Sequence, residues 1–187
     1  MGLSNHHVIR CARAQDELPT FKFELEKSEG KVIGGSYGKE ATVKQLPISK
    51  GIAGVSIRLE PGAMRELHWH PTSDEWQYVI EGQISVTLFG SHGRYRVETL
   101  NKGDVGYIPQ GYGHSIENVG AKGCRVLIGF NTGHYEAIDL SMWIAGNPLD
   151  VLATNFGKPQ SLFERFPRER VFIAPTETPR HGDRELD

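Results

Sequence analysis

The sequence predicts an all-β fold, a sandwich or barrel built as one domain. Between residues 41 and 131, short apolar runs recur at even spacing, which is typical of sandwiches and barrels. Turn-forming residues bound the runs, as in Glu60-Pro61-Gly62 and Lys102-Gly103-Asp104. The composition agrees, because 22 glycines and 10 prolines in 187 residues suit an architecture rich in turns. This length is enough for one well-formed core with extensions.

The expected elements follow one another in a simple order. Strands are expected at residues 41–48, 52–60, 65–70, 75–81, 84–89, 95–99, 105–108, 113–118 and 125–131. Residues 1–40 are polar and rich in glycine, so they are expected to form an N-terminal arm before a barrel of residues 41–132. From Gly133 the apolar spacing becomes helical, and residues 133–160 are expected to form helices packed on the barrel. One of these begins at Asn147-Pro148 and ends near Gly157. Residues 161–187 are expected to be an extended tail, on the surface or on a neighbouring subunit.

Charge and composition argue against several classes of partner. A net charge of −2 gives no reason to expect nucleic acid or an acidic membrane. Only Cys11 and Cys124 are present, without C-x-x-C spacing, so a disulfide framework is not expected. The first residues lack the apolar run of a signal peptide, and no stretch of about 18 apolar residues occurs. We therefore expect a cytoplasmic protein.

Three histidines and one glutamate occur at the spacing of metal ligands. His68 and His70 share one face of an expected strand, about 6.6 Å apart along it. Glu75 opens the next strand after the turn at residues 71–74. His114 comes from a later strand, entered through glycines that let the backbone bend sharply. We expect the four to converge on one inward-facing ion, because they are costly to bury without it. The alternative is a set of hydrogen-bonded core residues.

Two fixed patterns surround these four residues. The first, G-x5-H-x-H-x4-E-x6-G, runs from Gly62 to Gly82, and the second, G-x5-P-x-G-x2-H-x3-N, runs from Gly103 to Asn118. Both resemble the paired motifs of the cupin superfamily. The resemblance implies a double-stranded β-helix, the jelly-roll form of the barrel.

A closer resemblance, to the bacterial oxalate decarboxylases, covers roughly residues 40–157. The matching segments are residues 41–49, 52–55, 59–70, 75–78, 103–109, 133–135 and 140–145. That family is typically bicupin, with two such domains in one chain, whereas this chain holds one copy. The resemblance implies a manganese ion on His68, His70, Glu75 and His114, with oxalate, a small dicarboxylate, as substrate. The ligand types alone leave Fe, Ni and Zn open.

The resemblance also implies a reaction, the conversion of oxalate to formate and carbon dioxide by a metal-centred radical route. Simple heterolysis would leave negative charge on a carboxyl carbon with no electron sink, whereas one-electron oxidation of oxalate weakens its C–C bond. Dioxygen is a candidate co-catalyst. Two alternatives remain: an oxalate oxidase that yields carbon dioxide and hydrogen peroxide, and a non-catalytic, metal-dependent carboxylate binder.

Arg65 matches the substrate arginine of the decarboxylases. Its guanidinium would form paired, charge-assisted hydrogen bonds with oxalate. Strict strand alternation instead places Glu66 on the face shared with His68 and His70. Arg65 can therefore reach the site only if Pro61-Gly62 or a bulge resets the register. We follow the resemblance and expect Arg65 in the site; the alternative is a solvated surface arginine. Tyr107 is a further polar candidate near the metal.

The proton donor is expected just after the second motif. In the decarboxylases a loop there carries a glutamate that acts as acid or base, and the matching stretch at residues 133–139 is shortened. Glu136 is our candidate donor, followed by Asp139. Both carboxylates could instead complement the dipole of a following helix.

Trp69 indicates assembly. Alternation turns it out of the barrel, where a large aromatic side chain is better explained by an interface than by solvent. Bicupins supply such a surface from their second domain, so we expect a homo-oligomer, a two-fold dimer that could extend to a hexamer. The arm of residues 1–40 would then cross to the partner. The alternative is that the chain's own arm or helices cover Trp69.

Overall fold

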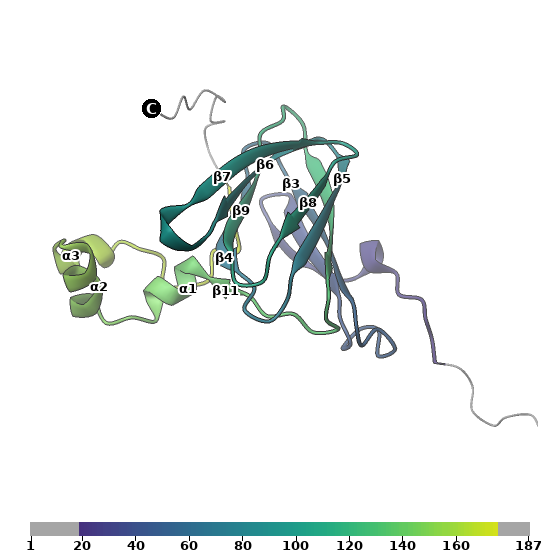
Figure 1. Cartoon of the computed structure of the whole chain (residues 1–187), viewed down its shortest axis with the longest axis horizontal. Coiled ribbons are helices and arrows are strands. Elements are labelled where there is room, and N and C mark those ends of the chain that lie inside the picture. Colours follow the sequence, from purple (N-terminus) through teal and green to yellow (C-terminus); the bar gives the residue numbers. More distant parts are fainter. Residues whose placement is uncertain (1–18, 176–187) are drawn as a thin grey trace, which may run out of the picture.

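The computed structural model describes residues 19–175 of the chain. Two antiparallel sheets face each other and enclose the core (Figure 1). The prediction of an all-β fold is confirmed, and the helices are few and short. None of the helices in the described part of the chain is long and apolar enough to cross a membrane.

After β3 the chain passes repeatedly from one sheet to the other. The first sheet has the order β1-β2-β3-β10-β5-β8, and the second has the order β11-β4-β9-β6-β7. The first comprises β1 (Lys31–Ile33), β2 (Ser36–Ala41), β3 (Ala53–Leu59), β5 (Glu75–Glu81), β8 (Val105–Ile108) and β10 (Cys124–Phe130). The second comprises β4 (Met64–Trp69), β6 (Gln83–Phe89), β7 (Tyr95–Asn101), β9 (Gly113–Asn118) and β11 (Ile138–Asp139), and β12 (Ile173–Ala174) also pairs with β4.

Strand alternation decides which side chains reach the space between the sheets. Along β5, Glu75, Gln77 and Val79 are buried, whereas Trp76 and Tyr78 are exposed. Apolar side chains from both sheets fill the core, among them Leu59, Val79, Ile84, Ile116, Val126 and Ile128. The polar side chains of the candidate site are therefore buried next to an apolar core.

The N-terminal part of the barrel differs from the expectation. Strands β1 and β2 lie within the expected arm of residues 1–40, yet they form a hairpin and β2 pairs with β3. Gly34 and Gly35, with φ of 54° and 86°, turn the chain between them, which lets a polar sequence form an edge of the sheet. The expected strand at residues 41–48 is instead a run of turns, in which the Thr42 N–H donates to the Gln45 side chain. Only the short 3-10 helix Leu25–Lys27 precedes the hairpin among the described residues.

The C-terminal helices form an extension of the barrel. They are α1 (Leu140–Ala145), α2 (Leu149–Phe156) and α3 (Gln160–Phe163). Helix α1 packs on β4, where Trp143 meets Trp69 edge to face with 5.8 Å between ring centroids. Helices α2 and α3 pack on each other and project from the barrel (Figure 1), whereas we expected all of residues 133–160 to pack on it. The end of α2 at Gly157, with φ of 60°, is as expected.

Two expectations about surfaces change as a result. Trp69 is partly buried by the chain's own helix α1, so it gives no argument for an interface. The described part of the expected tail begins in α3, on the projecting extension, and returns to its own barrel at β12, which pairs with β4. Residues 1–18 of the expected arm, which include Cys11, and residues 176–187 of the tail lie outside the described residues.

Candidate metal centre

Strands β4, β5 and β9 bring four metal-ligating side chains together. His68 lies in β4, His70 directly follows it, Glu75 opens β5 and His114 lies in β9. All four are buried, and one ligand atom from each lies within 4.8 Å of the others. His68 and His114 are opposite each other in the β4–β9 pair. Gly111, with φ of 80°, turns the chain toward β9 while its N–H donates to the carbonyl of His70 at 2.9 Å.

Each imidazole is oriented through its Nδ1 atom. Nδ1 of His68 lies 2.7 Å from the carbonyl of Glu66, and Nδ1 of His70 lies 2.7 Å from the carbonyl of Glu136. Nδ1 of His114 lies 3.1 Å from the carbonyl of Tyr112. Because a carbonyl oxygen only accepts, each Nδ1–H donates, and each Nε2 is left as the metal-binding atom.

Glu75 supplies negative charge at the centre of the cluster. Its Oε1 accepts from the side chain of Gln77 at 2.7 Å, and its Oε2 lies 2.8 Å from Nε2 of His70 and 3.1 Å from Nε2 of His114. Burial alone would raise the pKa of Glu75, but His114, when its Nε2 also carries a proton, donates to Oε2 and holds this pKa well below its ordinary value. Glu75 is therefore a carboxylate. A metal ion would take the place of the proton on Nε2.

His68 is held in its neutral form. Burial is the main reason that the pKa of His68 lies well below its ordinary value, and the positive charge of Arg65 adds to the effect. A neutral imidazole is the form that binds a metal ion, so the site meets that requirement without first losing a proton.

The cluster fits a divalent cation. Nε2 of His70 is buried and, within the described residues, has no hydrogen-bond partner. With its proton on Nδ1, this atom is an acceptor that faces a second acceptor, Oε2 of Glu75, at 2.8 Å. A cation between them removes the conflict between two buried lone pairs. Three imidazole nitrogens and one carboxylate oxygen suit Mn, Fe, Ni or Zn.

A bulge in β4 places Arg65 inside the barrel. The register of β4 against β9 shifts between Arg65 and His68, so Arg65 lies opposite Ile116 while His68 lies opposite His114. Opposite residues share a face of a sheet, so Arg65 and His68 both point inward and strict alternation fails here. Arg65 is buried, forms an ion pair with Asp139 and donates to the carbonyl of Phe172 at 3.2 Å.

Glu66 contacts the C-terminal segments instead of the metal ligands. Its carboxylate accepts the backbone N–H of Ser141 at 3.1 Å and that of Phe172 at 2.5 Å. Strand alternation assigns Glu66 to the site, but its carboxylate instead binds the C-terminal segments that follow the barrel.

The other predicted residues lie at different places. The carbonyl of Glu136 holds His70, while its side chain is exposed. Asp139 is buried beside Arg65 and lies opposite His68 in the β11–β4 pair. The expectation that Tyr107 lies near the metal is wrong. Tyr107 pairs with the outward-facing Trp76, and it is 56% exposed on the outer face of the barrel.

Sequence reasoning missed Gln77, Arg170 and Phe172. Gln77 lies two residues after Glu75 in one strand, and this spacing is a signal that would have found it. Phe172 meets Arg65 from 107 residues further along the chain, and Arg170 contacts Asp139 from the same segment. No local pattern marks either residue, because their roles depend on how the C-terminal segment returns to β4.

Known proteins resemble the chain in both sequence and structure. The family described as Cupin matches residues 25–160. The oxalate decarboxylase of Bacillus subtilis is 35% identical over 165 residues, which cover 87% of this chain and 42% of that protein. An oxalate decarboxylase of Arthroderma benhamiae is 36% identical over 173 residues, which cover 91% of this chain and 41% of that protein.

The structural likeness is of the same extent. A solved structure of the Bacillus subtilis oxalate decarboxylase at pH 4.6 matches with a TM-score of 0.81 and 34% identity, over 88% of this chain and 43% of that one. The chain thus spans about two fifths of the length of these relatives.

Proposed function

Because this chain belongs to the cupin family, we propose that it is a manganese-dependent oxalate decarboxylase, which converts oxalate and a proton to formate and carbon dioxide. One arrangement supports this function above all others. A buried cluster of three imidazoles and one carboxylate shares the interior of the barrel with the buried guanidinium of Arg65. A metal ion and a guanidinium together suit a small dianion such as oxalate.

The metal would be held by Nε2 of His68, His70 and His114 and by Glu75. Manganese is the preferred ion, since Mn(II) centers are described for the Bacillus subtilis oxalate decarboxylase. When bound, the ion supplies the one-electron chemistry that weakens the C–C bond of oxalate, with dioxygen as a candidate co-catalyst. The chain's own residues bind and orient the substrate and move the proton.

Arg65 would bind a carboxylate of oxalate through two parallel hydrogen bonds. Its planar guanidinium matches the two oxygens of a carboxylate, which an ammonium group cannot do. The burial of Arg65 excludes water and strengthens this contact.

Glu136 is our proposed proton donor. The backbone carbonyl of Glu136 accepts a hydrogen bond from Nδ1 of His70, so the backbone of Glu136 lies directly beside a candidate metal ligand. The side chain is exposed and can take protons from solvent before it delivers one to the carbon that becomes formate C–H.

Oxalate oxidase is the second candidate, and the surroundings of the two candidate proton donors, Asp139 and Glu136, favour it. Within the described residues, Asp139 is paired with two guanidinium groups and the side chain of Glu136 is exposed to solvent. Without an effective proton donor, oxalate, dioxygen and two protons would yield two carbon dioxide and one hydrogen peroxide. A non-catalytic, metal-dependent carboxylate binder is the third candidate.

A product measurement separates the three candidates. Mn-loaded protein is incubated with oxalate in air, and formate, carbon dioxide and peroxide are quantified. Decarboxylation gives one formate per oxalate consumed, oxidation gives one peroxide, and a binder consumes no oxalate. The proposal fails if formate is absent.

The role of Glu136 is tested by the same assay on Glu136→Gln. We expect a lower formate yield and a larger share of peroxide. Glu164→Gln, which changes an exposed glutamate after α3, is the matched control and should leave the products unchanged. A formate yield equal to that of the wild type would assign the proton to another donor.

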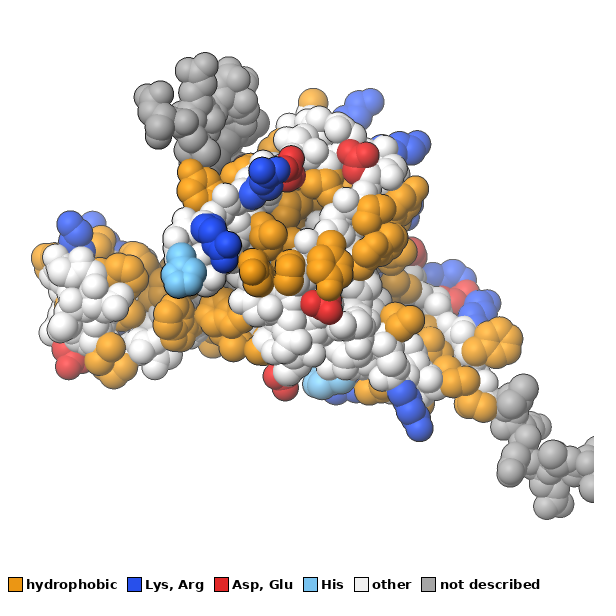
Figure 2. Space-filling view, viewed as in Figure 1, with side chains coloured by type: hydrophobic (Ala, Val, Ile, Leu, Met, Phe, Trp, Pro, Cys, Tyr) orange, Lys and Arg blue, Asp and Glu red, His pale blue; other side chains and the backbone are white. Residues whose placement is uncertain are grey.

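A homo-oligomer belongs to the same proposal, through a surface other than Trp69. Trp76, Tyr78, Val105, Tyr107 and Leu127 form what we call the outer aromatic face, and each is between 38% and 56% exposed. Hydrophobic side chains gather on the side of the barrel where β5 and β8 lie (Figure 2). A surface of this kind is typical of protein interfaces, and a second copy of the chain is our proposed occupant.

A further inference from the structure

A buried carboxylate already occupies the guanidinium that the proposed function assigns to the substrate. The side chains of Arg65 and Asp139 are each 4% exposed, and Nη2 of Arg65 lies 2.6 Å from Oδ1 of Asp139. The other terminal nitrogen, Nη1, donates to the carbonyl of Phe172. An incoming carboxylate must therefore displace a partner that Arg65 already has.

Asp139 has a second cationic partner, Arg170. Nε of Arg170 contacts Oδ2 of Asp139, the oxygen that is not paired with Arg65. The guanidinium groups of Arg65 and Arg170 both lie over the ring of Phe172, at 4.7 and 4.9 Å from its centroid. A buried carboxylate without a counter-charge is strongly unfavourable. Because Arg170 remains, Asp139 can release Arg65 without becoming unpaired.

The position of Asp139 suits an exchange with substrate. Asp139 lies opposite His68, so its side chain shares the inner face of the sheet with that candidate ligand. It also lines a surface cavity of about 520 Å³ together with Tyr135, Trp143 and Arg170. Arg65 and the four candidate ligands do not line this cavity. Of the two arginines paired with Asp139, only Arg170 lines this cavity.

We propose that Asp139 is an internal competitor for Arg65, a positioning residue that yields Arg65 to a substrate carboxylate and takes it back afterwards. This inference rests on the proposed function, in which Arg65 binds the substrate. The competition weakens the binding of every carboxylate that uses Arg65. A dicarboxylate compensates through its second carboxylate, whereas a monocarboxylate such as the product formate has none. Asp139 would thereby promote the release of formate.

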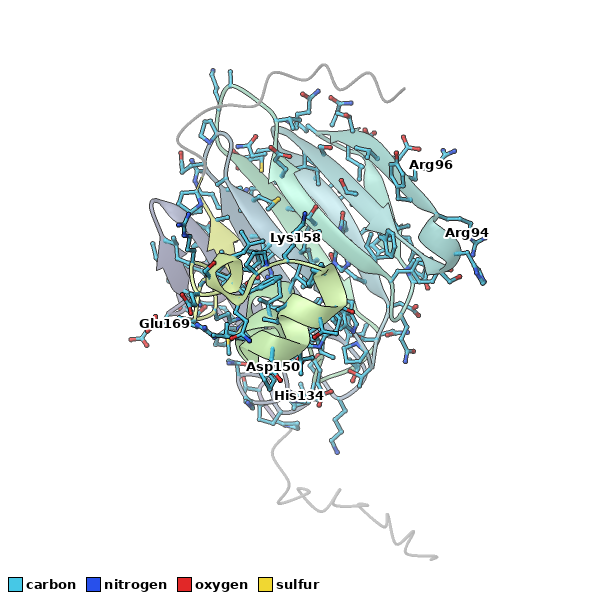
Figure 3. The ribbon with its side chains drawn as sticks, turned by 90° about the vertical axis from the view of Figure 1, so that its left-hand side faces the viewer. Arg94, Arg96, His134, Asp150, Lys158 and Glu169 are labelled. Carbon is cyan, nitrogen blue, oxygen red and sulfur yellow. The ribbon has the colours of Figure 1, made fainter. Side chains whose placement is uncertain are left out.

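The affinities of two variants test the competition, because they should change in opposite directions. Mn-loaded wild type, Asp139→Asn and Arg170→Gln are titrated by calorimetry with formate and, in the absence of dioxygen so that turnover is suppressed, with oxalate. Asp139→Asn keeps the shape but removes the competing charge, and should tighten binding about tenfold, since a charge-assisted hydrogen bond is of that order. Arg170→Gln leaves Asp139 dependent on Arg65 alone, and should weaken binding. Asp150→Asn, on the helical extension (Figure 3), is the matched control and should change neither affinity.

The outcomes separate this inference from the proposed function. A purely structural role of the ion pairs would weaken binding in both variants, and this result, or unchanged affinity in Asp139→Asn, overturns the proposal. Asp139→Ser, checked by its thermal melt, takes the place of Asp139→Asn if the latter does not fold. If the affinities for oxalate rank as expected, with Asp139→Asn tightest and Arg170→Gln weakest, but oxalate is not consumed, the proposed function fails while the competition stands. If oxalate is consumed but the affinities do not follow this ranking, only the proposed competition fails.

Discussion

At the level of single side chains, protonation decides whether the cluster can hold a metal. The same Nε2 lone pairs bind either a proton or an ion, so acid and metal compete for the site. Burial favours the neutral form of His68, whereas the proximity of His114 favours the ionised form of Glu75. Near neutral pH both effects leave the side chains in the forms that bind a cation. Both should also affect how the stability of the metal-free protein depends on pH.

The metal-free protein should lose stability as the pH falls below about 6.5, the ordinary pKa of histidine. Because the pKa of His68 is lowered in the folded protein, the unfolded chain takes up the proton first, and stability is lost from that pH down to the lowered pKa. The lowered pKa of Glu75 acts in the same direction at a lower pH, as the pH falls through that lowered value. Thermal melts between pH 7.5 and 5.0 measure the loss.

The contribution of His68 to this loss of stability is measured with His68→Gln, in which Tm should depend less on pH. His92→Gln, which changes an exposed histidine in the turn before β7, should leave the dependence unchanged. If Tm did not vary over this range in the wild type, His68 would not be a buried neutral group.

Arg65→Lys should separate substrate binding from metal binding. The ammonium keeps the charge but cannot form two parallel contacts with a carboxylate, so we expect kcat/KM for oxalate to fall by about tenfold or more. The metal content should stay that of the wild type. Arg96→Lys, which changes an exposed arginine at the rim of the barrel (Figure 3), is the control. Unchanged kinetics in Arg65→Lys would exclude Arg65 from the substrate site.

Among the elements, β4 connects the site to the rest of the chain. It pairs with β9 on one side and with β11 and β12 on the other, and its bulge separates Arg65 from His68. The side chain of Glu66, at this bulge, binds the N–H groups of Ser141 and Phe172 and so holds both C-terminal segments on β4. The pair of Arg65 with Asp139 depends on the same segments.

Glu66→Ala should therefore destabilise the fold. Two partly buried N–H groups would lose their acceptor, which costs roughly 2–4 kcal/mol in the free energy of unfolding. Urea unfolding of the metal-free protein measures the change. Glu66→Gln, which keeps one acceptor oxygen, should lose less, and Glu164→Ala should lose almost nothing. A loss below 0.5 kcal/mol, on the order of a surface change, would show that the C-terminal segments do not depend on Glu66.

Sequence patterns predicted the strands that have clear turn residues at both ends. They missed the strands that depend on contacts with distant parts of the chain. Strand β5, with Glu75 in and Trp76 out, matches the expectation in both its ends and its faces. The hairpin of β1 and β2 was not expected, because its polar residues carry no core pattern and its pairing with β3 stabilises it. Four candidate ligands could be chosen from spacing alone. Strand alternation misplaced Arg65, since a bulge leaves no local signal in the sequence, whereas the resemblance to the decarboxylases had assigned Arg65 to the site.

For the molecule as a whole, the outer aromatic face is the feature that a single copy leaves unexplained. Trp76 and Tyr78 stack with 6.3 Å between ring centroids, and both are exposed. The relatives named above are more than twice as long as the region that matches this chain. A second copy would cover this face.

Light scattering at micromolar concentration tests the assembly. The wild type should be a dimer or a multiple of it, such as a hexamer, and Trp76→Glu should shift it toward the monomer, because a carboxylate is costly to bury in an apolar interface. Phe156→Glu, which changes an exposed aromatic residue on α2, should leave the mass unchanged. A monomeric wild type would refute the assembly, and a dimer that tolerates Trp76→Glu would place the interface elsewhere.

Whether the four side chains hold a manganese ion can be seen by anomalous diffraction at the Mn absorption edge, from crystals of protein produced with manganese. The expected result is one peak per chain among Nε2 of His68, His70 and His114 and the carboxylate of Glu75. The peak should vanish in Glu75→Ala, because the site then loses its only negative charge. A peak elsewhere, no peak at all in the wild type, or a peak that survives the combined loss of His68 and His114 would contradict the metal centre and the function built on it.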